Sequence, residues 1–94
     1  MDYVIFDLEW NQCPYGKGKE NPKLPFEIIE IGAVKMDGER NVVGTFHRIV
    51  KPVVYQHLHH RTREVVGLTE EDLQSGIPFS QAVHEFFSFA GGAC

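Results

Sequence analysis

The chain has 94 residues, of which 43% are hydrophobic and 23% are charged, and nine Lys and Arg against 13 Asp and Glu give a net charge of −4. This composition is that of a globular domain and argues against a disordered chain, and the length fits one domain or a piece of one. The acidic balance argues against a generic basic nucleic-acid coat protein, although nucleic acid bound through metal ions is compatible with it.

Two cysteines, Cys13 and Cys94, stand near the ends of the chain without the spacing of a disulfide framework or a zinc ribbon, and neither has a sequence-adjacent base. No apolar run approaches the roughly 18 residues of a membrane span, and the N-terminus lacks a basic segment followed by an apolar one. We therefore expect a soluble cytoplasmic protein with free thiols and no contact with a membrane.

The first predicted strand is Asp2–Trp10, which is rich in β-branched and aromatic residues. The side chains of a strand alternate between two faces, and the first face of this strand is apolar. The second face begins with Tyr3 and Ile5 and becomes acidic at Asp7 and Glu9. A central strand whose C-terminal end emerges from the core has this pattern. Four apolar side chains share the first face: Val4, Phe6, Leu8 and Trp10.

Residues Asn11–Glu27 form a long connection rich in Pro, Gly and Lys. Structureless connections longer than about 12–15 residues are usually functional or disordered. Two interpretations stay open, a mobile surface loop or a basic flap beside a phosphate-bearing substrate.

Two further strands are predicted at Ile28–Met36 and Val42–Lys51, and Pro52 ends the second of them. Asp37 and Gly38 indicate a turn between them, within a loop longer than two residues. The link is too short for a parallel crossover, so the two strands are predicted to form an antiparallel hairpin.

Three helices are predicted in the second half of the chain. The first spans His60–Val66, and the second follows a capping box at Thr69–Asp72. The order strand, hairpin, helices predicts the α/β or α+β class, with a single domain over residues 1–94. Apolar residues of the third helix repeat at helical spacing: Phe79, Ala82, Val83, Phe86, Phe87 and Ala90.

Asp7 and Glu9 are separated by one residue, so both carboxylates project from the same side of the strand, about 6.6–7 Å apart along the backbone. Carboxylates suit Mg²⁺ and Mn²⁺, and carboxylates of this kind can bridge two cations about 3.5–4 Å apart. The alternative is the ordinary alternation of polar and apolar residues in a half-buried strand, which needs no metal. Asp and Glu are depleted in strands, which weakens this alternative.

Five blocks resemble, in this order, the N-terminal half of the DnaQ-like, DEDDh-type 3′–5′ exonucleases: FDLEW, EIIEIGAVKMDG, HRIVKP, EVVGLTEEDL and PFSQAVHEFFSF. The resemblance is to the branch with the histone-mRNA and small-RNA 3′ exonucleases and the bacterial KapD-type proteins, and it runs from Val4 to Phe89. It implies a ribonuclease H-like fold of the α/β class. In this chain the fold would be truncated to a three-stranded antiparallel sheet, the first strand plus the hairpin, followed by helices.

The resemblance also implies hydrolysis of the terminal phosphodiester at the 3′ end of single-stranded RNA or DNA with two divalent metals, Mg²⁺ or Mn²⁺. By position, Asp7 would ligate both metals, and Glu9 would hold one of them and contact the terminal nucleotide. The backbone from Leu8 to Trp10 would lie against the 3′ nucleotide. Stacking of a base on Trp10 and a core position for Trp10 both stay open.

Two further residues, Leu68 and Thr69, match the family segment that packs against the terminal base. Leu68 equally suits a helix–helix junction, and Thr69 equally suits a helix N-cap. The family's site needs four acids plus a general base, and the base pairs with one acid in a His-x4-Asp motif that this chain does not contain. We therefore expect residues 1–94 to be the N-terminal portion of a single exonuclease domain, inactive on their own.

The family places a downstream strand beside the first one. Without that neighbour, the segment VIFDL becomes an exposed apolar sheet edge, which recruits other chains. The sequence therefore predicts a homodimer, a strand-swapped assembly, or a piece of a longer protein. The alternative function is that of a truncated, non-catalytic relative that binds protein or nucleic acid as a regulatory module.

Four other polar residues carry weaker signals. His57, His59 and His60 form a cluster, but no Cys or carboxylate stands near them at zinc-finger spacing, so a solvated loop is favoured over a metal site. Glu30 lies between apolar neighbours in the second strand. It is interpreted as a solvated cross-strand partner in preference to a residue that orients the metal ligands.

Overall fold

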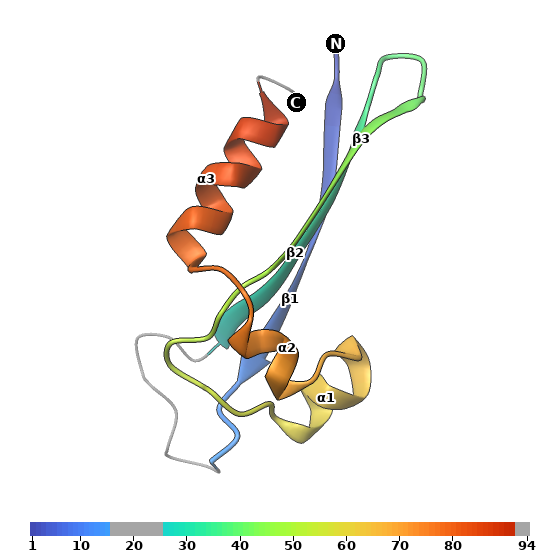
Figure 1. Cartoon of the computed structure of the whole chain (residues 1–94). Coiled ribbons are helices and arrows are strands. Elements are labelled where there is room, and N and C mark those ends of the chain that lie inside the picture. Colours follow the sequence, from blue (N-terminus) through green and yellow to red (C-terminus); the bar gives the residue numbers. More distant parts are fainter. Residues whose placement is uncertain (16–25, 92–94) are drawn as a thin grey trace.

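The computed structural model of the chain describes residues 1–15 and 26–91. Three strands form one antiparallel sheet in the order β1-β2-β3: Tyr3–Gln12, Phe26–Met36 and Val42–Ile49. Three helices follow the sheet along the chain (Figure 1): α1 at His60–Val66, α2 at Glu70–Gln74 and α3 at Phe79–Ala90. The predicted three-stranded antiparallel sheet followed by helices is thereby confirmed.

β1 is longer than the predicted strand Asp2–Trp10, because Asn11 and Gln12 still pair with β2. The prediction of a connection over Asn11–Glu27 is therefore wrong at both ends, and its residues 16–25 lie outside the described residues. The apolar alternation stops before the strand does, since the last two positions of β1 carry polar side chains.

A β-bulge interrupts the pairing of β1 with β2 between Glu9 and Trp10. Glu9 pairs with Glu30 whereas Trp10 pairs with Ile28, so Ile29 has no partner on β1. Ile29 is fully buried in the apolar cluster beneath α1 and α2, whereas Ile28 packs on the cluster beneath α3. The extra residue thus interrupts the regular alternation of β2, since Ile31, two residues after Ile29, packs on the opposite layer in the cluster beneath α3.

The hairpin between β2 and β3 closes through residues 37–41. The Asp37 carboxylate accepts hydrogen bonds from the backbone N–H groups of Glu39 and Asn41 at 2.8 and 2.9 Å. These bonds hold the pKa of Asp37 below its ordinary value, and the bond from Asn41 is the largest cause. Arg40 takes a left-handed conformation with φ of 68°. The antiparallel hairpin and its long loop are thereby confirmed.

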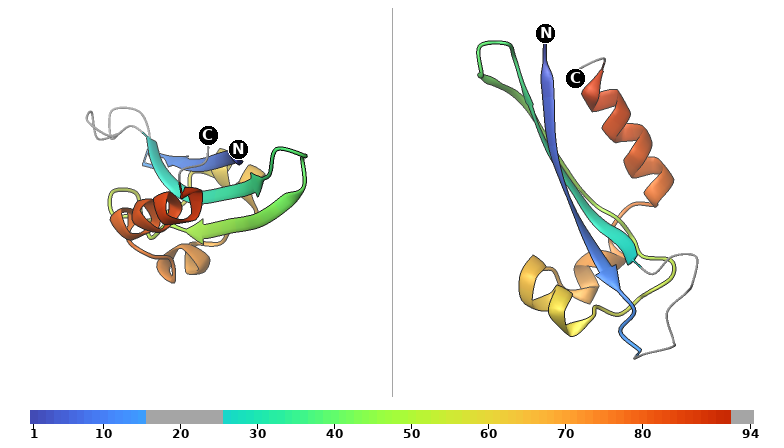
Figure 2. Two further views of the ribbon diagram at one scale, coloured as in Figure 1. Left: turned by 90° about the horizontal axis from the view of Figure 1, so that it is seen from above. Right: turned by 180° about the vertical axis from the view of Figure 1, so that it is seen from behind.

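Different helices cover the two faces of the sheet (Figures 1 and 2). α3 runs along one face, where Ala82 and Phe86 pack with the buried side chains of β2 and β3. α1 and α2 gather against the other face, at the end of the sheet where β1 finishes. The buried cluster beneath them consists of Ile29, Leu58 and Leu73.

The three helices lie where the sequence predicts them, and α2 begins with the expected capping box. The Thr69 hydroxyl accepts a hydrogen bond from the Asp72 N–H at 3.1 Å, and the Asp72 carboxylate accepts one from the Thr69 N–H at 2.9 Å. β3 ends at Ile49 rather than at Lys51, because Val50 instead forms an isolated parallel bridge with the segment before α3. No helix in the described part of the chain is long and apolar enough to cross a membrane.

Candidate functional site

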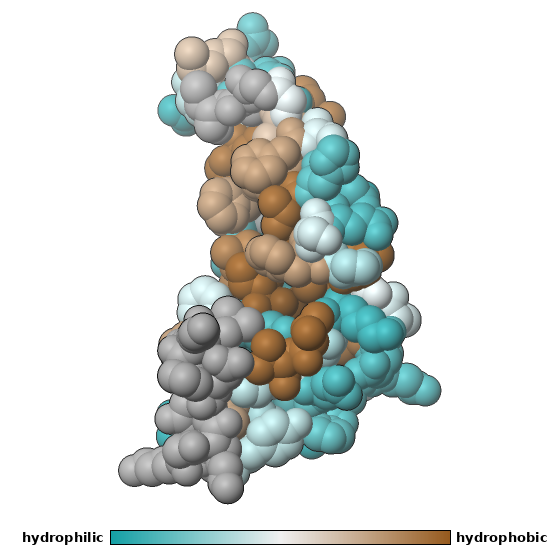
Figure 3. Space-filling view, turned by 90° about the vertical axis from the view of Figure 1, so that its left-hand side faces the viewer, coloured by the Kyte–Doolittle hydropathy of each residue, from teal (hydrophilic) through white to brown (hydrophobic). Residues whose placement is uncertain are grey.

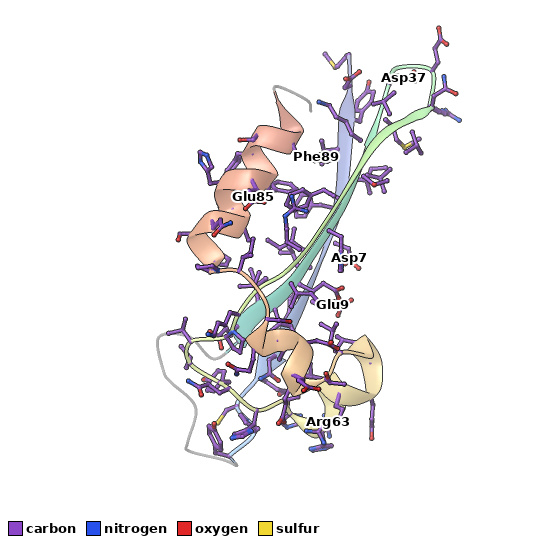
Figure 4. All side chains as sticks on the ribbon, in the orientation of Figure 1. Asp7, Glu9, Asp37, Arg63, Glu85 and Phe89 are labelled. Atoms are coloured by element: carbon purple, nitrogen blue, oxygen red, sulfur yellow. The ribbon has the colours of Figure 1, made fainter. Side chains whose placement is uncertain are left out.

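Asp7 and Glu9 occupy alternate positions of β1, and both project from the face of the sheet opposite α3 (Figure 4). The Asp7 residue is exposed and Glu9 is half-buried. Among the described residues, no hydrogen bond or ion pair engages either carboxylate. Their oxygen atoms are therefore open to a ligand from solvent.

The two carboxylates line a pocket of about 370 Å³ between β1 and α1. A volume of this size lies in the range of roughly 300–1,000 Å³ that small-ligand sites occupy. Aromatic, cationic and apolar side chains therefore share one cavity with two acids. The other lining residues are Leu8, Trp10 and Gln12 from β1, and Arg61, Thr62, Val65 and Val66 from α1.

Gly32 keeps the sheet open beside Asp7. The strand register places Gly32 opposite Asp7 on one side and opposite His47 on the other, so all three share one face. A Cβ atom at Gly32 would meet no other atom within 4 Å. Glycine inside a strand often marks a place where a ligand approaches the backbone closely. The surface next to Asp7 is thus bare backbone.

Glu30 is a third carboxylate on this face, directly opposite Glu9. Its side chain contacts the imidazole of His47 on the neighbouring strand β3. The interpretation of Glu30 as a cross-strand partner is therefore confirmed. In the described part of the chain, Glu30 therefore has a partner, whereas the carboxylates of Asp7 and Glu9 have none.

Leu8 and Trp10 flank the acidic pair in different ways. Leu8 is half-buried and packs on the cluster beneath α3, so its side chain turns away from the two acids. Trp10 is 53% exposed, and its ring centroid lies 6.3 Å from that of Phe26. The interpretation of Trp10 as a core residue is therefore wrong, and its indole stands at the edge of the pocket.

Leu68 and Thr69 lie in the connection between α1 and α2, outside the set of residues that lines the pocket. Leu68 packs against the buried cluster beneath these helices, and Thr69 caps α2. The structure thus brings Asp7, Glu9 and Trp10 together and gives Leu68 and Thr69 local structural roles.

Two buried polar residues that the sequence did not single out position the wall of the pocket. The Glu27 carboxylate accepts hydrogen bonds from three consecutive backbone N–H groups, of residues 53–55, at 2.7, 3.0 and 2.9 Å. The Asn11 amide donates to the His57 carbonyl and accepts from the His59 N–H, both at 2.9 Å. These bonds tie the segment before α1 to the ends of β1 and β2. Each is a polar residue near the end of a strand, a local signal that does not specify its distant partners.

The three clustered histidines serve the loop and the start of α1. His59 is the N-cap of α1 and accepts a hydrogen bond from the Arg61 N–H at 3.1 Å, while its ring stacks on His60 with centroids 4.3 Å apart. Burial lowers the pKa of His59, and the neighbouring charges of His60 and Arg61 lower it further. His57 lies 3.3 Å from Glu70. Each histidine thus has a contact that requires no metal.

The donor set at the pocket suits a hard divalent cation. Asp7 and Glu9 offer carboxylate oxygens, the ligands that Mg²⁺ and Mn²⁺ prefer, and both cations usually keep several waters. Within residues 1–15 and 26–91, no group of three or more His, Cys, Asp or Glu side chains is arranged to hold a metal ion. The described residues therefore offer a pair of ligands.

The antiparallel sheet with helices on both faces matches the fold of ribonuclease H-like exonucleases. A family model described as Exonuclease (RNase_T) matches residues 4–94. The chain therefore belongs to this exonuclease family.

Two curated relatives are DNA polymerases III of the PolC type. The one from Thermotoga maritima is 35% identical over 63 residues, and the one from Thermotoga petrophila is 38% identical over 64 residues. Each alignment covers 67% of this chain but 4% of the relative. The chain thus corresponds to a small part of these much larger proteins.

Solved structures share the fold at low sequence identity. The nuclease domain of 3′hExo, described as a DEDDh family member bound to rAMP, has a TM-score of 0.77 and 20% identity, over 95% of this chain and 43% of that one. Cell-death related nuclease 4 has a TM-score of 0.74 and 20% identity, over 94% and 29%. E. coli Exonuclease I in complex with an oligonucleotide has a TM-score of 0.67 and 17% identity, over 94% and 18%. This chain spans less than half of each.

Proposed function

We propose that this chain supplies the β1 part of a metal-dependent site for 3′–5′ exonucleolytic cleavage of single-stranded RNA or DNA. The observation that carries the proposal is the pair Asp7 and Glu9, two carboxylates that share one pocket of an exonuclease-family fold and have no partner among the described residues. The exposed indole of Trp10 in the same pocket supports a nucleotide as the ligand, because every base has a face that stacks on an aromatic ring.

The roles of the residues follow from their places. Asp7 and Glu9 would hold Mg²⁺ or Mn²⁺, which when bound supplies Lewis-acid stabilisation of a phosphate and lowers the pKa of a bound water. Glu9 would contact the terminal nucleotide, and the backbone of Leu8 to Trp10 would lie along it. Leu68 and Thr69 would act indirectly, by stabilising the junction between α1 and α2. Leu68 packs on the buried cluster beneath these helices, and Thr69 caps α2.

We further propose that residues 1–94 are the N-terminal portion of one exonuclease domain and do not cleave by themselves. The sequence has no His-x4-Asp motif, and Asp7 and Glu9 supply two of the four acids that the family's site uses. The test is incubation with Mn²⁺ and a 5′-labelled single strand. The full-length substrate should persist, and a ladder of shortened products would contradict the proposal.

Metal binding tests the half-site itself. Isothermal titration with Mn²⁺ should give an affinity that falls at least about tenfold in Asp7→Asn, since even the loss of a group behind a metal ligand typically costs 10–100-fold. Glu39→Gln is the matched control, because it removes one exposed carboxylate from the hairpin loop far from the pocket. Equal Mn²⁺ affinities of the two variants and the wild type would refute the half-site.

A second candidate function is that of a non-catalytic binding module that self-associates. An apolar groove of about 180 Å³ lies between β1 and α3, and all of its lining side chains are apolar. Figure 3 shows apolar side chains gathered over the middle of the side of the molecule that carries α3. The side chains that form the groove come from both elements and the sheet beneath: Phe6, Leu8, Ile28, Ile31, Phe79, Val83, Phe86 and Phe87.

A further inference from the structure

Helix α1 presents two different faces, and one of them forms the second wall of the acidic pocket. Arg61 and Val65 are four residues apart, as are Thr62 and Val66, so these pairs lie side by side on the helix. All four line the pocket that contains Asp7. Arg63 falls outside this set. α1 thus contributes a cation and apolar side chains to the cavity.

Within residues 1–15 and 26–91, Arg61 differs from Arg48 and Arg63 because no carboxylate pairs with its guanidinium. Arg48 donates to Glu85 at 2.8 Å, and Arg63 donates to Glu70 at 2.8 Å. No ion pair within the described residues involves the Arg61 guanidinium, although Asp7 and Glu9 line the same pocket. The Arg61 guanidinium and the two carboxylates therefore line the same pocket without forming an ion pair with one another.

The chemistry of the pocket identifies the class of ligand that suits this cation. A phosphodiester chain carries a negative charge at every nucleotide, so the Arg61 guanidinium on one wall and a divalent cation held by Asp7 and Glu9 on the other would each bind one of its phosphates. Val65 is 76% exposed and Trp10 is 53% exposed, so apolar and aromatic surface is available for sugars and bases. A single-stranded nucleic acid carries all of these groups.

We propose that Arg61 is a substrate-binding residue whose guanidinium binds a backbone phosphate of a single strand that lies in this pocket. Val65, on the same face of α1, packs against the sugar or base of that strand. This inference rests on the proposed function and adds α1 to it as a phosphate-binding wall.

The test is the salt dependence of binding of a 5′-fluorescein-labelled oligothymidylate to the whole chain in Mn²⁺, measured by fluorescence anisotropy. Each phosphate contact contributes about 0.7 to the slope of log affinity against log salt for a single strand. Arg61→Gln should lower that slope by about this amount, so that raising salt from about 50 to about 200 mM costs roughly 2–3-fold less affinity than in the wild type. Arg61→Lys should keep the slope, because it keeps the charge.

Arg63→Gln is the matched control, since Arg63 lies on the same helix but is bound to Glu70. If Arg61→Gln and Arg63→Gln leave the slope equally unchanged, the inference is overturned. Mn²⁺ titration of the same variants separates this failure from that of the proposed function. Unchanged slopes with Mn²⁺ binding that depends on Asp7 would refute the role of Arg61 alone, whereas absence of both Mn²⁺ and oligonucleotide binding would refute both.

Discussion

Glu27 is a buried carboxylate at the start of β2, and its partners are the backbone N–H groups of Val53, Val54 and Tyr55. Hydrogen bonds to a charged group contribute roughly 1.5–3 kcal/mol each when they are broken one at a time. These bonds fix the segment that leads to α1, and α1 lines the pocket opposite β1. Glu27 therefore positions α1 although it does not line the pocket itself.

We expect Glu27→Gln to destabilise the chain by about 1–3 kcal/mol, because the new amide group turns a donor toward N–H groups that need an acceptor. Urea denaturation followed by circular dichroism measures this loss. Glu64→Gln, on the exposed face of α1, is the control and should change stability little. Equal losses in the two variants would mean that the three hydrogen bonds contribute nothing specific.

Glu70 makes the stability of the α1–α2 region depend on pH. Its carboxylate accepts hydrogen bonds from the Leu58 N–H at 3.1 Å and from Arg63 at 2.8 Å. The bond from Leu58 is the largest cause that holds the pKa of Glu70 below its ordinary value of 4.5, and the contact with His57 adds to it. The unfolded chain therefore binds more protons as pH falls below 4.5, so the folded state loses stability there.

The matching experiment compares urea midpoints of the wild type and Glu70→Gln between neutral pH and the acid side of 4.5. The wild type should lose the contribution of Glu70 as pH falls through the lowered pKa. The variant lacks the titrating group and should show a shallower dependence over the same window. Parallel profiles would contradict the assignment.

At the scale of single residues, the sequence predicted what depends on neighbours along the chain. Asp7 and Glu9 face one way because a strand alternates, and this required no knowledge of the fold. The partners of Glu27 lie 26–28 residues away, and those of Asn11 lie 46 and 48 residues away. No local pattern specifies such contacts, so these two positioning residues could not be predicted.

At the scale of elements, α2 is the shortest helix and depends most on its cap. Its five residues are too few for a stable isolated helix, so the capping box of Thr69 and Asp72 contributes a large share of the stability of α2. Thr69→Ala should cost about 1 kcal/mol, whereas Thr69→Ser keeps the hydroxyl and should cost much less. Thermal unfolding of both variants measures the difference. A Thr69→Ser variant as unstable as Thr69→Ala would show that the methyl group, not the cap, is what matters.

The helices were predictable to the residue at several ends, and the strands were not. Helix ends carry local chemical signals, such as Gly67 and Gly91, which adopt the left-handed conformation that stops α1 and α3. The ends of β1 and β3 depend on pairing with segments distant in the sequence, and so does the bulge between Glu9 and Trp10, where the register of β1 on β2 shifts. A single sequence therefore predicts the ends of helices much better than the ends of strands.

At the scale of the whole molecule, the chain is long and thin. Its radius of gyration is 15.0 Å and its dimensions are 47 × 24 × 22 Å, whereas a compact globule of this length would have a radius of about 12 Å. The sheet has three strands, and within the described residues β1 pairs with β2 alone. One long edge of the sheet is therefore unpaired among the described residues, and Phe79 and Phe87 on the apolar stripe of α3 are exposed.

This exposure leads to a prediction of self-association at high concentration. Phe6, Phe79 and Phe87 are 56%, 48% and 68% exposed along the groove between β1 and α3. An unpaired edge next to an apolar surface favours pairing with another chain, because both the backbone groups and the side chains gain partners. Sedimentation velocity should therefore show the wild type shifting toward larger species as concentration rises. Phe87→Glu should suppress that shift by placing a charge in the groove.

Val43→Glu makes the same apolar-to-acidic change on β3, at an exposed residue outside the groove, and should associate like the wild type. If both variants suppress association equally, net charge rather than the groove controls it. A wild type that stays a monodisperse monomer at every concentration would contradict the prediction outright. Because Asp7 and Glu9 project from the opposite face of β1, association through the groove should leave Mn²⁺ affinity unchanged, and titration of the associated and the dissociated forms tests whether the two faces act independently.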